Sequence, residues 1–194
     1  DLIISLIAEK GPIPFTSFME VALYSPEAGY YTSGREAWGP EGDYITSLDV
    51  SPVFGRTIAK QVAECWEALG SPSSFELIEA GAGRGWLSCT ILDHARDICP
   101  GLYDAMTVRL VERAGGPEGF VSGKVSWHRE LDEIAPVEAA LVLSNELIDS
   151  FPVHRVCFSG GKLKELFVDF NGESFIEKEG PLSDEALESY FERA

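Results

Sequence analysis

Residues 75–86 read Phe-Glu-Leu-Ile-Glu-Ala-Gly-Ala-Gly-Arg-Gly-Trp, the segment that is most informative about the fold. An apolar run typical of a β-strand ends at Glu79 and is followed by glycines at positions 81, 83 and 85. Glycine lets the backbone turn sharply and approach a ligand, and the helix expected from Trp86 onward begins with unpaired N–H groups. A strand, a glycine loop and a helix in this order are typical of a nucleotide-cofactor site in a doubly wound, mainly parallel sheet.

The spacing of these glycines distinguishes two classes of cofactor. The loop has the pattern Glu-x-Gly-x-Gly-x-Gly, whereas dinucleotide-binding loops have Gly-x-Gly-x-x-Gly. The pattern therefore favours S-adenosyl-L-methionine over a nicotinamide cofactor. A tight turn without a ligand is the alternative, but it would need only one glycine. We expect the cofactor to bind over Gly81, Ala82, Gly83 and Gly85.

Two carboxylates stand at the ends of expected strands beside this loop. Glu79 ends the strand of residues 75–79, where it meets either the ammonium group of a bound amino acid or the N-terminal dipole of the next helix. Glu112 ends the strand of residues 107–112, a position where acidic residues accept hydrogen bonds from ribose hydroxyls. A surface salt bridge is the other interpretation of Glu112. Trp127, which follows in the third strand, is either an adenine neighbour or part of the core.

A second polar group follows the apolar run of residues 139–144, which is typical of a central parallel strand buried on both faces. The group consists of Asn145, Glu146 and Asp149. Glu146 and Asp149 are three residues apart, so one helical turn would place both carboxylates on one face. Such a pair can hold a guanidinium group by bidentate hydrogen bonds and orient a nitrogen toward a methyl sulfonium. A capped turn without catalytic function is the alternative.

The charge of the chain limits its partners. There are 15 Lys and Arg against 32 Asp and Glu, a formal net charge of −17 over 194 residues. Such a surface repels nucleic acid and anionic membranes, so we expect neither as a partner, and it attracts a basic or Arg-bearing protein segment. Acidity that only keeps the protein soluble is the simpler interpretation. No apolar run approaches the roughly 20 residues that cross a bilayer, and residues 1–4 do not resemble a signal peptide.

Cysteine and histidine usage predicts no metal site. The four cysteines, at positions 65, 89, 99 and 157, form no Cys-x-x-Cys pair, and the three histidines are scattered. They are typical of a reducing compartment.

The pattern of helices and strands predicts three regions. Residues 1–70 form an N-terminal helical arm and a lid-like loop, residues 71–159 a Rossmann-like cofactor-binding core, and residues 160–194 a β-hairpin insertion with a terminal helix capped by Ser183. Between the second and third strands only residues 113–123 remain, fewer than a helical crossover normally takes. The crossover is therefore reduced, or residues are absent from this sequence.

Four blocks of the sequence resemble the MidA-like family of S-adenosyl-L-methionine-dependent methyltransferases. They lie at residues 11–31, 42–55, 79–85 and 145–154, the last reading Asn-Glu-Leu-Ile-Asp-Ser-Phe-Pro-Val-His. The resemblance implies an α/β, Rossmann-like class I methyltransferase fold in which a C-terminal part is missing from this chain. It also implies that residues 30–47, with Gly34 and Thr46, fold over the cofactor, and that residues 145–149 face the methyl group.

The function implied by this resemblance is methyl transfer to nitrogen, above all to an arginine side chain of a protein. The compartment implied is the cytoplasm of a bacterium or the mitochondrial matrix of a eukaryote. Two alternatives stay open: a non-catalytic assembly factor that keeps the fold, and a dinucleotide-dependent oxidoreductase. The glycine spacing argues against the second.

Overall fold

The computed structural model describes residues 2–33, 43, 50–116 and 123–192, and the chain forms two compact units. One unit comprises residues 36–149, and the other comprises residues 1–35 together with 150–194. We call them the parallel unit and the antiparallel unit after the sheet that each contains.

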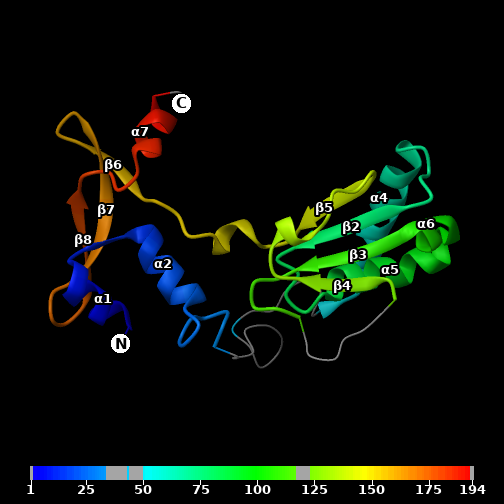
Figure 1. The fold of residues 1–194 in the computed structure, drawn as a ribbon, viewed down its shortest axis with the longest axis horizontal. Coiled ribbons are helices and arrows are strands. Elements are labelled where there is room, and N and C mark those ends of the chain that lie inside the picture. The colour runs from blue at the N-terminus through cyan, green and yellow to red at the C-terminus, as the bar shows by residue number, and fades with distance from the viewer. Residues whose placement is uncertain (1, 34–42, 44–49, 117–122, 193–194) are drawn as a thin grey trace. The chain divides into compact units, whose positions relative to one another are not determined.

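The parallel unit is built on a four-stranded sheet with the strand order β4-β3-β2-β5. All neighbouring strands in this sheet run parallel (Figure 1). The strands are β2 (Phe75–Ala80), β3 (Met106–Val111), β4 (Val125–His128) and β5 (Ala140–Ser144). The predicted Rossmann-like α/β fold with a parallel sheet is thus confirmed.

Three helices cover one face of this sheet: α4 (Val53–Ala68), α5 (Trp86–Ile98) and α6 (Pro100–Ala105). Alternate residues of β2 and β3 point into this layer, because successive side chains of a strand face opposite sides. Burial of these apolar side chains holds the layers together. The fully buried members of this core include Ala59, Phe75, Leu77, Ile91, Leu102, Met106, Val108 and Leu110.

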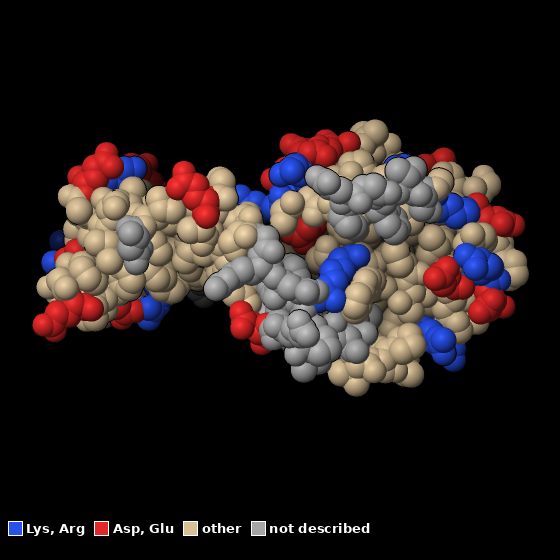
Figure 2. All heavy atoms as spheres, turned by 90° about the horizontal axis from the view of Figure 1, so that it is seen from below, with Lys and Arg blue, Asp and Glu red and all other residues tan. Residues whose placement is uncertain are grey.

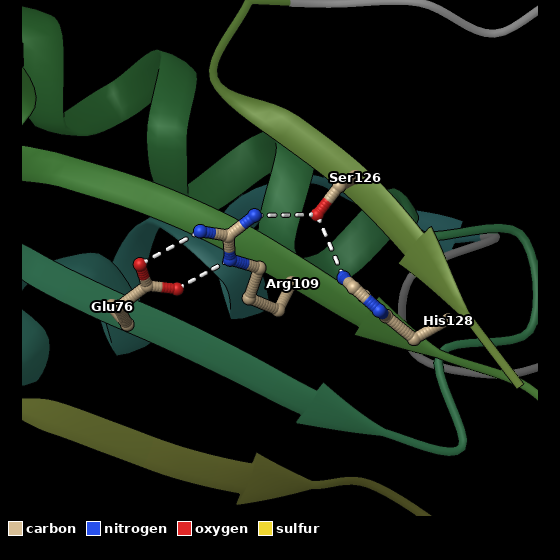
Figure 3. Close-up of polar contacts among 4 residues, drawn as sticks. All are labelled: Glu76, Arg109, Ser126 and His128. Atoms are coloured by element: carbon tan, nitrogen blue, oxygen red, sulfur yellow. Dashed lines mark hydrogen bonds and ion pairs between the residues drawn. The ribbon is translucent and has the colours of Figure 1, made fainter. Parts of the chain in front are cut away.

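The opposite face of the sheet carries a chain of polar contacts (Figure 3). Arg109 on β3 donates two hydrogen bonds to the carboxylate of Glu76 on β2, and its third nitrogen donates to Ser126 Oγ at 3.0 Å. Ser126 Oγ lies 2.9 Å from Nε2 of His128. Glu76 is only 7% exposed, so the guanidinium supplies the charge partner that a buried carboxylate needs.

Strand β5 differs from the sequence prediction. It forms one edge of the described sheet, and Val142 is 62% exposed, so the expectation of a central strand buried on both faces is wrong for the described residues. Its apolar composition resembles that of a buried strand, but no described strand pairs with its other edge.

The antiparallel unit contains strands β1 (Ile13–Pro14), β6 (Val156–Ser159), β7 (Lys162–Phe170) and β8 (Phe175–Gly180). The long strand β7 pairs with the other three. Gly160 and Gly161 join β6 to β7 with φ angles of 61° and 75°, the geometry of a type I′ turn, so the predicted hairpin is present. Helices α1 (Leu2–Lys10) and α2 (Phe15–Tyr24) pack on this sheet through Ile7, Ile13, Phe18 and Val168.

On the face of β7 opposite to Val168 lies a fully buried carboxylate, that of Glu165. It accepts a hydrogen bond from His154 Nδ1 at 2.8 Å and another from the N–H of Ser183 at 2.7 Å. Ser183 therefore does not cap the last helix, α7 (Glu185–Phe191), as predicted. Asp184 is the cap, and its side chain accepts from the N–H of Ala186.

The division into units does not coincide with the predicted boundaries at residues 70 and 159. Helix α4 belongs to the parallel unit because its apolar face, including Ala59 and Val62, packs into the core beside α5. Between β3 and β4, the described residues 112–116 and 123–124 contain no helix. Among the described residues, no helix is long and apolar enough to span a membrane.

Candidate functional site

The loop after β2, residues 81–85, has the backbone geometry that its glycines allow. Gly81, Gly83 and Gly85 have φ angles of 70°, 53° and 72°, a left-handed conformation that residues with a Cβ rarely adopt. The N–H groups of Gly81 and Ala82 both donate to the carbonyl oxygen of Val111, at 2.9 and 3.0 Å. The loop is therefore anchored to β3, the neighbouring strand.

Two of the glycines also need their lack of a side chain for space. A Cβ on Gly85 would lie 2.6 Å from Leu110 Cδ1 and 3.2 Å from the Trp127 ring. A Cβ on Gly81 would lie 2.6 Å from Leu147 Cδ1. The loop is thus packed against side chains of β3 and β4 on one side and of the turn after β5 on the other, and its glycines leave backbone that a ligand can approach closely.

Glu112 turns toward this loop. Its carboxylate accepts from the N–H of Gly83 at 3.0 Å and from the N–H of Ala114 at 3.3 Å. Each carboxylate oxygen can accept a further hydrogen bond, because an ionised carboxylate has about four acceptor positions. The geometry brings Glu112 beside the glycine loop, as a ribose-binding residue requires.

Glu79 lies beneath the loop instead of on its surface. The residue is 3% exposed, and its carboxylate accepts from the N–H of Ser88 in the first turn of α5 at 3.2 Å. This is the geometry of the alternative interpretation, an anion at a helix N-terminus. Burial raises the pKa of Glu79 to about 7, while the hydrogen bonds from Ser88 lower it and the charge of Glu112 adds to the rise.

Trp127 packs against the buried core next to the loop. Gly116 lies so close that a Cβ there would come within 2.1 Å of the indole ring. The contacts of Trp127 are therefore those of a core residue, one of the two interpretations of its place in the sequence.

The second polar group, at residues 145–149, leaves the sheet directly beside the glycine loop. Strands β2 and β5 are parallel neighbours, and Ala80 pairs with Ser144, so Gly81 and Asn145 follow at the same edge. We call residues 145–149 the acceptor turn, after the role that the sequence predicts for them. Glu146 and Asp149 are exposed, and Asn145 is half-buried.

The acceptor turn is not the single helical turn expected from the spacing of its carboxylates. Glu146 has a φ angle of 50°, and only Ile148–Ser150 form a 3₁₀ turn. The left-handed conformation of Glu146 is outside the helical region, so the three-residue spacing alone does not place its carboxylate beside that of Asp149. Non-glycine residues in this conformation are uncommon and concentrate at functional sites.

Leu147 is the residue of this region that sequence reasoning missed. Its side chain occupies the space that the Cβ of any non-glycine residue at position 81 would need. The available signal was the adjacency of two parallel strands, each followed by a polar or glycine-rich segment.

Gly34 and Thr46, the two expected cofactor contacts of the lid-like loop, lie outside the described residues. Within the part of the chain that the structure describes, no group of three His, Cys, Asp or Glu side chains is arranged to hold a metal ion. Acidic side chains are spread over the visible face of each unit, with Lys and Arg between them (Figure 2).

Comparisons with known proteins identify relatives of the chain. The sequence model of a family described as "Putative S-adenosyl-L-methionine-dependent methyltransferase" matches residues 57–194. The mitochondrial protein arginine methyltransferase NDUFAF7 homolog of Drosophila melanogaster is 35% identical over 188 residues, covering 84% of this chain and 43% of that protein. The mitochondrial protein arginine methyltransferase NDUFAF7 of Homo sapiens is 28% identical over 193 residues, with 85% and 43% coverage. The chain thus spans less than half the length of these relatives.

The solved structures agree on the fold. A COG1565 superfamily member from Burkholderia thailandensis, bound to S-adenosyl-homocysteine, superposes with a TM-score of 0.77 at 23% identity, covering 98% of this chain and 51% of that chain. A second crystal structure of a protein of that superfamily, from the same organism, gives a TM-score of 0.71 at 25% identity. Family and fold together confirm the cofactor predicted from the glycine spacing, S-adenosyl-L-methionine.

Proposed function

Because the chain belongs to the MidA-like family of S-adenosyl-L-methionine-dependent methyltransferases, we propose that it transfers a methyl group to nitrogen, specifically to an arginine side chain of a protein. The relatives named as protein arginine methyltransferases support this choice of acceptor.

One observation carries the proposal: the glycine loop and the acceptor turn stand side by side at the carboxyl edge of the parallel sheet. Ligands of open α/β sheets bind at this edge. The loop offers bare backbone, and Glu112 is already hydrogen-bonded to it through Gly83. The acceptor turn presents two exposed carboxylates, Glu146 and Asp149.

Residues at the glycine loop bind the cofactor, and residues of the acceptor turn bind the methyl acceptor. The backbone of residues 81–85 and the carboxylate of Glu112 hold the cofactor, with Glu112 accepting from the ribose hydroxyls. When bound, S-adenosyl-L-methionine supplies an electrophilic methyl group on sulfur. We also propose that Gly34 and Thr46 contact the cofactor and that Glu79 interacts with the ammonium group of its amino-acid part.

The acceptor turn positions the nitrogen. Asn145 accepts from the guanidinium edge through its side-chain oxygen, and the carboxylates of Glu146 and Asp149 accept further N–H hydrogen bonds of the guanidinium group and keep one of its nitrogens directed at the methyl carbon. The nitrogen–carbon bond forms as the sulfur–carbon bond breaks, and the nitrogen's proton passes to a carboxylate of the turn.

The partner and the compartment follow the same reasoning. The net charge of −17 attracts a basic, arginine-bearing protein segment and disfavours nucleic acid and anionic membranes. We propose the mitochondrial matrix as its site of action, since the named eukaryotic relatives are mitochondrial; these names give no support to a cytoplasmic protein.

Calorimetry with S-adenosyl-homocysteine tests the cofactor site. Replacing Gly83, at a φ of 53°, by valine should reduce affinity at least about 100-fold, because a β-branched residue strongly disfavours that conformation. Gly123→Val is the matched control, since Gly123 has nothing within 4 Å of an added Cβ and no left-handed φ. Equal binding by wild type and Gly83→Val would contradict the assigned loop.

Methyl transfer is tested with a tritiated methyl donor and an arginine-rich peptide. Asp149→Asn should lower turnover about 100-fold while the affinity for S-adenosyl-homocysteine changes less than about threefold, since the carboxylate acts only on the acceptor. Cofactor binding without methyl transfer to the peptide or to any mitochondrial lysate protein would favour the non-catalytic assembly factor instead.

A further inference from the structure

The contact between Leu147 and Gly81 joins the two halves of the proposed site. A Cβ on Gly81 would lie 2.6 Å from Cδ1, 3.2 Å from Cγ and 3.3 Å from Cβ of Leu147. Such closeness to three successive atoms means that rotation of a terminal methyl group could not relieve it. The side chain of Leu147 is therefore seated on the backbone of the glycine loop.

The direction of this side chain is specific within the turn. Leu147 is half-buried, whereas the next residue, Ile148, is 74% exposed. Two adjacent apolar residues of nearly equal size thus have opposite environments, and only Leu147 faces the loop. Hydrophobic packing favours this arrangement because it removes the Leu147 side chain from water.

The backbone on either side of this contact is held in uncommon conformations. Gly81 has a φ angle of 70°, and Glu146, directly before Leu147, has a φ angle of 50°. The left-handed conformation is unfavourable for a residue with a Cβ, so surrounding contacts must maintain it at Glu146. Directly after Glu146 comes the packing of Leu147 on Gly81, a contact of the kind required.

We propose that Leu147 is a positioning residue through which the glycine loop sets the conformation of the acceptor turn. When the cofactor orders residues 81–85, Leu147 carries this order to residues 145–149, and Glu146 and Asp149 are presented to the acceptor. The inference rests on the proposed function, because it assigns the loop to the cofactor and the turn to the acceptor.

Hydrogen exchange measured by mass spectrometry tests this coupling without any methyl acceptor. In the wild type, saturating S-adenosyl-homocysteine should slow amide exchange in both segments, residues 81–85 and residues 145–149, by about tenfold or more. In Leu147→Ala, the cofactor product should still protect residues 81–85, but the protection of residues 145–149 should be lost. Leu147→Met should restore it, because methionine nearly conserves the volume of leucine.

The matched control is Ile148→Ala, which removes an apolar side chain from the same turn on its exposed side and should leave both protections unchanged. Full protection of residues 145–149 in Leu147→Ala would overturn the inference. Absence of protection at residues 81–85 in the wild type would instead contradict the proposed function, so the two failures are distinguishable.

A double-mutant cycle gives a second, independent measurement. Gly81→Ala should weaken binding of S-adenosyl-homocysteine, because the new Cβ collides with Leu147 and the φ angle is unfavourable. Adding Leu147→Ala should recover part of the loss, by roughly fivefold or more, since the contacts with Cδ1 and Cγ disappear while the 3.3 Å contact with Cβ and the φ penalty stay. Strictly additive effects of the two substitutions would contradict a direct packing contact.

Discussion

The glycine loop and the acceptor turn both need left-handed backbone, but the loop achieves it with glycine and the turn with a glutamate. Both follow neighbouring parallel strands and both contain left-handed backbone. The loop places glycine at all three of its left-handed positions, whereas the turn places Glu146 at its own, with a φ angle of 50°.

This difference separates two ways of recognising a ligand. Where the backbone itself must touch the ligand, side chains are removed and glycine makes the conformation inexpensive. Where a side chain must be presented, the backbone strain remains and neighbouring packing has to hold it. Four substitutions test that contrast, in order of decreasing expected effect.

Gly85→Ala should destabilise the parallel unit by about 3 kcal/mol, from a left-handed φ penalty of about 1–2 kcal/mol and overpacking of about 1–3 kcal/mol. The overpacking arises because the new Cβ lies 2.6 Å from Cδ1 of the fully buried Leu110. Urea unfolding measures the change. Gly160→Ala is the control that isolates the backbone penalty, since Gly160 has a φ of 61° and open space around it. Equal losses for both variants would show that packing against Leu110 contributes nothing.

Glu79→Gln should change how stability depends on pH. In the folded protein the pKa of Glu79 is about 7, above its ordinary 4.5, so folding favours the protonated form. The native state then binds more protons than the unfolded state between these values, and stability should fall as pH rises from about 4.5 to 7. At pH 8 the variant should exceed the wild type by roughly 2–3 kcal/mol, with little difference at pH 4.5.

Thermal unfolding at both pH values measures this effect. Glu146→Gln, which removes an exposed carboxylate from the acceptor turn, is the control measured alongside it. A Glu79→Gln profile parallel to that of the wild type would mean that the pKa of Glu79 is the same in the folded and the unfolded protein.

Glu112→Gln should lower the affinity for S-adenosyl-homocysteine about tenfold, equivalent to about 1.4 kcal/mol. The amide oxygen can still accept from Gly83, so the loop should keep its form, while the charged hydrogen bonds to the ribose become neutral and weaker. Calorimetry measures the affinity, and Glu138→Gln, an exposed carboxylate of the same unit, is the control. Unchanged affinity in Glu112→Gln would remove Glu112 from the cofactor site.

Glu146→Gly should stabilise the parallel unit by about 0.5–1 kcal/mol, because glycine relieves the left-handed penalty but gains freedom in the unfolded chain. Turnover should fall nevertheless, since the carboxylate is lost. Glu146→Ala keeps the penalty and should not stabilise. If the glycine variant is the less stable one, Glu146 makes contacts that outweigh its backbone strain.

Local patterns in the sequence predicted most of the parallel unit. The helix expected over residues 86–98 has these bounds in the structure, because a left-handed glycine sets its start and its apolar face is regular. The glycine loop and the hairpin turn at Gly160 and Gly161 were predictable for the same reason: each depends on a backbone conformation that glycine favours. The position of Glu112 followed from the end of the apolar strand β3.

Features that depend on contacts distant in sequence were not predictable. The apolar composition of β5 indicated a strand buried on both faces, but composition does not reveal which neighbours are present. The spacing of Glu146 and Asp149 indicated a helical turn, yet tertiary packing of Leu147 on Gly81 holds a different backbone. The short helix α6 and the pairing of β1 with β7 also lack a local signal strong enough to identify them.

The carbonyl oxygen of Val111 accepts the N–H groups of both Gly81 and Ala82. This shared acceptor means that the bend at residues 81–85 cannot be transplanted with its own strand and helix alone. A graft into another scaffold must carry β3 with it, in the same alignment. A one-residue deletion within β3 would likewise dislodge the bend, although no residue of the bend itself had changed.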